Sequence, residues 1–152
     1  MGQLYDQDLV LWSEEQARGL RAAAGAGWDA IIDWQNVAAE IESLARSERH
    51  ALASYIGTVI EHLLKLEVSP STDLARGWRE TVRRARRDIA RLLKDNPSLA
   101  REIPAMVVDE LGSARSLVRA SLEDYEEQPR VDLETLAYSD EQVHGDWFPE
   151  IK

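Results

Sequence analysis

A seven-residue apolar repeat in the middle of the chain constrains the fold more than any other feature of the sequence. Five apolar residues keep this interval without interruption: Ala38, Ala45, Leu52, Val59 and Leu66. Seven residues make almost two full turns of an α-helix, so the repeat places these side chains on one helical stripe. A strand would need a period of two, and no segment of the 152 residues alternates convincingly in that way. We therefore predict an all-α fold.

Helical spacing also predicts the helices of the first half of the chain. The first helix covers about 6–24, with Asp6 as its N-cap. Residues 34–67 follow a second N-cap, Asp33. They form either two helices, the second capped by Ser47, or one long helix, because no Gly or Pro separates them.

The second half begins with an arginine-rich helix over 73–94, followed by a helix over 98–127. Pro104 lies in the second turn of the latter, where it either kinks the helix or marks its true start. Residues 128–152 read as an acidic, mostly irregular tail with one turn of helix after Ser139.

Short connections between amphipathic helices favour antiparallel neighbours, so the fold class that we predict is an up-and-down helical bundle of four to five helices. The length is that of one ordinary domain. We expect residues 1–152 to form a single helical domain, with its core in 5–127 and the acidic tail in 128–152.

Composition excludes several classes of function. The chain has no cysteine, which rules out disulfides, thiolate metal sites and thiol nucleophiles. Its first residues lack the features of a signal peptide, and no apolar run reaches the length of a membrane span, so we expect a cytoplasmic protein without a membrane partner. The net charge of −10 disfavours nucleic-acid binding by the surface as a whole.

Charge is strongly segregated along the chain. Residues 76–94 hold eight basic and two acidic residues, whereas residues 123–152 hold two basic and ten acidic ones. Arginines bind phosphate or carboxylate groups well, but no aromatic residues are interleaved on the polar face of this helix to stack on bases. The alternative to a partner is electrostatic balance within the molecule, between the arginine helix, the acidic tail and four glutamates, Glu14, Glu15, Glu40 and Glu42.

The leading hypothesis is a non-enzymatic protein–protein interaction module that forms a homo-oligomer. We expect its partner-binding residues on the arginine helix and in the tail: Arg79, Arg83, Arg87, Trp147 and Phe148. The aromatic pair in the tail either folds back as a cap or fills a groove on a neighbouring molecule. Nucleic-acid binding through the same arginines is another hypothesis.

A metal-dependent or hydrolytic enzyme is the hypothesis from a different class. Its candidate catalytic residues are His62, at the edge of an apolar helical stripe, and Glu40 or Glu42 on a facing helix. A histidine there is equally typical of the edge of a core. Glu141 and His144 have the Glu-x-x-His spacing of di-metal bundles, but no second copy exists, so we expect no metal and no cofactor.

Eight short motifs, in this order and spacing, resemble those of a known family: Tyr5-Asp6-Gln7-Asp8, Asp33-Trp34, Glu40-Ile41-Glu42-Ser43-Leu44, Arg46-Ser47-Glu48-Arg49, His62-Leu63-Leu64-Lys65, Gly77-Trp78-Arg79, Asn96-Pro97-Ser98-Leu99 and Asp146-Trp147-Phe148-Pro149. The chain resembles the bacterial family called domain of unknown function DUF29 over roughly residues 5–149. The resemblance implies an almost wholly helical fold and a bacterial cytoplasmic setting, and it brings no established activity or site residues. One departure is Ala45, where relatives often have Gly.

Overall fold

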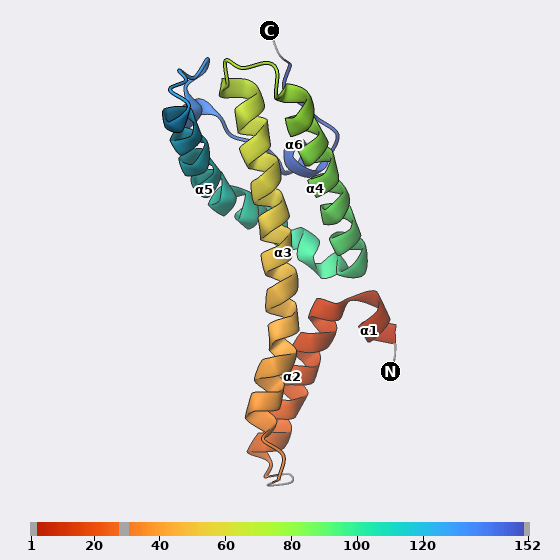
Figure 1. Ribbon diagram of the computed structural model, residues 1–152. Helices are drawn as coiled ribbons and strands as arrows, with labels where there is room; N and C mark the ends of the chain where they lie inside the picture. The colour runs from red at the N-terminus through yellow and green to blue at the C-terminus, as the bar shows by residue number, and fades with distance from the viewer. Residues whose placement is uncertain (1–2, 28–30, 151–152) are drawn as a thin grey trace. The chain divides into compact units, whose positions relative to one another are not determined.

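The computed structural model describes residues 3–27 and 31–150 (Figure 1). The fold is all-α with bundle-like packing, as predicted, and no strand occurs among the described residues. The helices, in chain order, are α1 (Gln3–Gln7), α2 (Leu9–Gly25), α3 (Trp34–Val68), α4 (Ala75–Asp95), the 3₁₀ helix η1 (Pro97–Glu102), α5 (Ile103–Asp124), the 3₁₀ helix η2 (Leu133–Thr135) and α6 (Asp140–His144). In the ranges described, no helix is long and apolar enough to span a bilayer.

The seven-residue repeat is the buried stripe of α3. Its five members are each at most 2% exposed. The helix runs from Trp34 to Val68 without a break, so the one-helix alternative is confirmed and Ser47 is not a cap. Asp33 starts this helix, because its carboxylate accepts a hydrogen bond from the backbone N–H of Asn36 at 3.2 Å.

Contacts divide the chain into two compact units, residues 1–51 with 92–100 and residues 52–91 with 101–152. The expectation of a single domain over 1–152 stays a prediction. In the first unit, α2 and the first part of α3 lie side by side (Figure 1), and four of their five buried residues are small: Ser13, Ala17, Ala38 and Ala45. Small residues allow the two helices to approach closely.

A buried polar junction holds the start of α2 against the segment between α4 and α5. Asp8 caps α2, because its carboxylate accepts from the backbone N–H of Leu11 at 2.9 Å and from that of Ser98 at 2.8 Å. The prediction of one helix capped by Asp6 is therefore wrong. Asn96 accepts from the backbone N–H of Val10 at 3.1 Å and donates to Glu48 at 2.9 Å.

The second unit contains the rest of α3, most of α4, α5 and the tail. In it, α3 and α4 run in opposite directions and are joined by a short loop (Figure 1). Its core is formed by large aliphatic side chains that are almost fully buried, among them Leu52, Ile56, Ile60, Leu63, Leu64, Val82, Ile89 and Val118. Pro104 stands in the first turn of α5, so it marks the start of that helix and does not kink it.

The tail has more order than the sequence predicts. Ser139 and Gln142 form a capping box at the start of α6, which confirms the expected helical turn after Ser139. The other short helix of the tail, η2, is capped by Asp132. The tail is held to the rest of the second unit by three buried side chains, Leu133, Tyr138 and Val143.

Candidate functional site

Helix α4 presents a face rich in arginines, with the exposed Glu80 among them. Six of its seven arginines are exposed or half-buried, and we call this set the arginine face: Arg76, Arg79, Arg83, Arg84, Arg87 and Arg91. The first and the last lie fifteen residues apart, which is ~22 Å along a helix. The opposite side of α4 carries Val82, Ala85 and Ile89, all buried. The helix is therefore held by its apolar side, and its charged side faces solvent.

The seventh arginine, Arg86, is buried and holds the tail. Only 8% of Arg86 is exposed. Its Nε donates to the carbonyl of Val143 at 2.9 Å, and one terminal nitrogen donates to the carbonyls of Gln142 and Trp147 at 2.7 and 2.6 Å. Burial lowers the pKa of this guanidinium, an effect that the charge of Asp146 opposes. Three backbone carbonyls thus replace the water that this cation has lost.

The predicted aromatic pair of the tail lies on this chain. The guanidinium carbons of Arg83 and Arg86 lie 5.3 and 4.8 Å from the centre of the Phe148 ring, which is cation–π distance. Trp147 packs against Tyr138, with ring centres 5.9 Å apart. The structure therefore brings two predicted partner-binding residues, Arg83 and Phe148, into contact with each other. Of the two alternatives for the tail, it adopts the folded-back one.

Two of the four glutamates that were expected to balance the arginine helix, Glu14 and Glu42, are paired with arginines outside α4. Arg21 forms two hydrogen bonds with Glu42, at 2.7 and 2.8 Å, and these lower the pKa of the Glu42 carboxyl. Arg49 pairs with Glu14 at 2.6 Å. Both pairs connect α2 with α3. In the part of the chain that the structure describes, no arginine of the arginine face forms an ion pair with a carboxylate.

The residues of the enzyme hypothesis do not converge. His62 is half-buried, and its Nδ1 lies 2.8 Å from the carbonyl of Thr58, one turn earlier in the same helix. Glu40 and Glu42 precede His62 by 22 and 20 residues on the uninterrupted helix α3. A helix rises ~1.5 Å per residue, so it does not bring such positions together. Glu40 is exposed and Glu42 is paired with Arg21.

His144, with Glu141, is the remaining candidate for a metal ligand. Glu141 and His144 are both exposed on α6. Within residues 3–27 and 31–150, no group of three or more histidine and carboxylate side chains is arranged to hold a metal ion. The expectation that no metal or cofactor is bound stays a prediction.

Sequence reasoning missed three residues that shape this part of the molecule. Arg86 was grouped with the other arginines, although its position on the helix lies between the apolar and the charged sides. Tyr138 is buried and donates a hydrogen bond to Glu67; burial, followed by the hydrogen bond and charge of Glu67, raises the pKa of its hydroxyl. The spacing of Tyr125 fits the buried side of α5, but 74% of it is exposed because the helix ends at Asp124.

Comparison with known proteins extends the resemblance seen in the sequence. The pattern of the family described as domain of unknown function DUF29 matches residues 4–148. The chain belongs to the DUF29 family. Both elements of the polar junction, Asp8 and the segment 96–98, are among the motifs that carried the resemblance. Two of the DUF29 motifs of this chain therefore hold the start of α2 against the segment after α4.

A solved structure with a similar fold is an α-helical protein of unknown function from Rhodospirillum rubrum. It is 23% identical to this DUF29 chain, the match covers 95% of this chain and 91% of the other, and the TM-score is 0.76. At this identity the likeness shows the fold alone. No protein with a curated function matches the chain.

Proposed function

We propose that this DUF29 chain is a protein–protein interaction module of the bacterial cytoplasm that binds an acidic protein surface through the arginine face of α4. One observation carries the proposal: the arginine face lacks carboxylate partners among the described residues, whereas Arg21 and Arg49 each have one. The six arginines outnumber the two acidic residues in the same ~22 Å of helix, Glu80 and Asp88, so a net repulsion among positive charges remains. An acidic partner removes that repulsion and offers the planar carboxylates that guanidinium groups bind with two hydrogen bonds.

The placement of the tail supports the same surface. Phe148 lies against Arg83 and the buried Arg86, so one edge of the arginine face is closed by a fixed aromatic side chain. The hydrogen bonds that Arg86 makes with the tail use backbone carbonyls, and within the described residues 128–150 no tail carboxylate forms a hydrogen bond with α4. A folded tail therefore shapes the surface without neutralising it.

A second copy of the chain is one acidic partner that the sequence offers. Residues 123–152 carry ten acidic and two basic residues, so the arginine face of one molecule is complementary to the tail of another. Homo-oligomers that form in this way dissociate as salt rises, because exposed charges are screened. Sedimentation velocity at low and high salt distinguishes a second copy from a different protein.

Nucleic acid fits the arginine face less well. Helix α4 itself offers no aromatic side chain on the arginine face for stacking on bases, because Trp78, in its first turn, is half-buried on the other side of the helix. The overall charge of −10 also repels a polyanion. Binding to mixed DNA or RNA whose affinity falls steeply with salt would favour nucleic acid instead.

The test compares two triple substitutions with the same change of charge. Arg79, Arg83 and Arg87 are replaced by Gln in one variant, and three exposed arginines outside α4, Arg18, Arg46 and Arg101, are replaced in the other. Proteins recovered with each variant from the native host are compared by quantitative mass spectrometry, and sedimentation velocity gives the oligomeric state. We expect the α4 variant to lose a partner or an oligomer that the control variant keeps. Identical partners and oligomeric state for both variants would overturn the proposal.

A further inference from the structure

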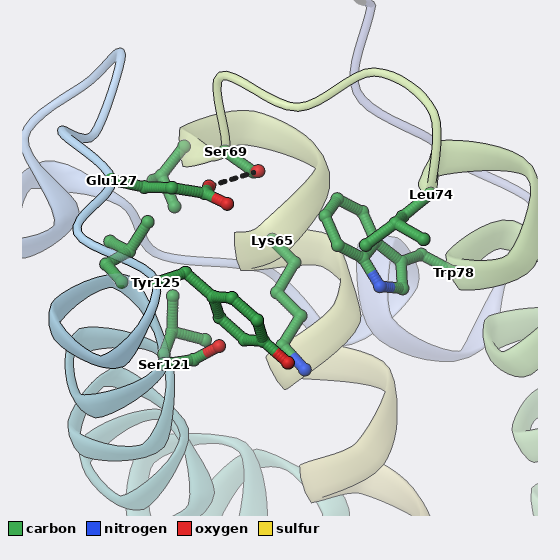
Figure 2. A pocket seen from close by; sticks show the side chains of 10 residues that line it. Lys65, Ser69, Leu74, Trp78, Ser121, Tyr125 and Glu127 are labelled. Carbon is green, nitrogen blue, oxygen red and sulfur yellow. Dashed lines mark hydrogen bonds between the residues drawn. The ribbon is translucent and has the colours of Figure 1, made fainter.

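The second unit contains a cavity that none of the functions considered so far uses. It has a volume of about 280 Å³ and is lined by residues from three helices and the segment after α5 (Figure 2). The end of α3 and the residue after it contribute Lys65, Val68 and Ser69, and the start of α4 and the loop before it contribute Trp78 and Leu74. The end of α5 and the segment after it contribute Val118, Ser121, Leu122, Tyr125 and Glu127. Liquid water occupies ~30 Å³ per molecule, so the cavity holds about nine waters or a ligand of similar size.

The cavity has an apolar floor and exposed apolar walls. Val68 and Val118 are at most 1% exposed and form part of the floor. At the rim, 58% of Leu74 and 74% of Tyr125 are exposed. Large apolar groups on either side of a concave apolar surface are typical of a site that a ligand covers. Trp78 adds a flat, half-buried wall between them.

Polar groups stand at both ends of the cavity. The Ser69 hydroxyl donates to Glu127 at 3.1 Å, so these two groups satisfy each other. At the other end of the cluster drawn in Figure 2 lie the Lys65 ammonium and the hydroxyls of Ser121 and Tyr125. Among the described residues, the ion pair that Lys65 forms is with Glu61, at 3.1 Å. An ammonium has three N–H donors, so two remain for a ligand.

We propose that this cavity binds a small carboxylic acid with an apolar, ring-containing body, whose carboxylate lies at Lys65 and whose ring lies between Trp78 and Tyr125. A ligand of about ten non-hydrogen atoms fits this volume. The cation at one end selects the carboxylate, and the aromatic walls select a flat body. The site is separate from the arginine face, which lies on the opposite side of α4, so it stands independently of the proposed function.

The experiment uses phenylacetate and its neutral analogue phenylacetamide as probes of the full chain. Binding is followed by the indole N–H signals of ¹⁵N-labelled protein, and the Trp78 signal is assigned with Trp78→Phe. We expect the Trp78 signal to shift on addition of phenylacetate, with the low-millimolar affinity that a ligand of about ten atoms reaches. Phenylacetamide should bind about tenfold more weakly, because a charge-assisted hydrogen bond is lost.

Two lysine variants test the assignment of the charge. Lys65→Met should bring phenylacetate down to the affinity of phenylacetamide, whereas Lys94→Met, which removes an exposed lysine at the end of α4, should leave both affinities unchanged. The comparison of the two probes on the unsubstituted chain needs no variant and therefore remains decisive if Lys65→Met does not fold. Absence of a Trp78 shift with either probe, equal affinity for both probes, or equal effects of the two lysine variants would each overturn the proposal.

Discussion

Replacing Arg86 by Met tests how the tail is held on α4. The substitution removes three hydrogen bonds, to the carbonyls of Gln142, Val143 and Trp147, and the cation from the face of Phe148. Each buried carbonyl that loses its donor costs about 1 kcal/mol, and the Met side chain regains part of the packing without the cost of burying a charge. We expect a loss of about 2.5 kcal/mol in the free energy of unfolding, or about 7 °C in Tm for a chain of this length.

Two measurements together separate this explanation from a general loss of stability. Thermal unfolding gives the change in Tm, and amide hydrogen exchange should show that protection is lost first in residues 140–148. Arg84→Met is the matched control, because Arg84 is exposed on the same helix and its side chain makes no hydrogen bond within the described part of the chain. Its effect should stay within about 0.5 kcal/mol. Equal stability of the two variants, or unchanged exchange in the tail, would refute the role assigned to Arg86.

The remaining predictions concern the junction of the first unit and the end of α5. Asn96→Ala should lower the free energy of unfolding by about 2 kcal/mol in urea titrations, because it leaves the buried N–H of Val10 without an acceptor, whereas Asp95→Ala next to it should change little. Burial raises the pKa of Asp8, but the N–H groups that donate to its carboxylate lower the pKa by more than burial raises it. The pKa of Asp8 in the folded chain therefore lies below 3.8. The stability that the Asp8 charge contributes is present above pH 3.8 and is lost as pH falls through the pKa of the folded chain. The stability difference between the unsubstituted chain and Asp8→Asn should therefore be largest near neutral pH and shrink in acid. A difference that does not depend on pH would contradict this role of Asp8. Glu126 has a φ of 53°, so Glu126→Gly should stabilise the chain by about 1 kcal/mol and Glu126→Ala should not; equal effects of the two would count against strain at this position.

Much of the fold follows from local patterns in the sequence. The seven-residue repeat of α3 needs only its own spacing to place every member in the core, and Ser139 needs only Gln142 three residues later to cap α6. Pro104 can only occupy the first turn of a helix without a kink, which is where α5 places it. Such features depend on neighbours within one or two turns.

The start of α2 could not be placed from the sequence because its signal is not local. Asp6 and Asp8 are equally good caps by residue type. The choice falls on Asp8 because its carboxylate also accepts the N–H of Ser98, ninety residues away. No sequence pattern near Asp8 predicts its contact with Ser98.

The role of Arg86 is hidden for a related reason. Its partners are backbone carbonyls of the tail, which have the same chemistry whatever the residue, so no complementary acidic side chain marks the contact. Tyr125 shows the limit of helical periodicity: its position fits the buried stripe, but α5 ends at Asp124 and the chain turns through Glu126. The separation of His62 from Glu40 and Glu42 follows from the absence of a break in α3, which the sequence left open.

The most direct test of the proposed function is site-specific photo-cross-linking in the native host. A photoreactive amino acid replaces Arg84, at the edge of the arginine face, and in a second variant replaces Arg18, which is exposed on α2. The proposal predicts a discrete cross-linked species from position 84 that is absent from position 18 and that disappears when Arg79, Arg83 and Arg87 are replaced by Gln. The same cross-links from both positions, or cross-links at position 84 that survive the triple substitution, would contradict it.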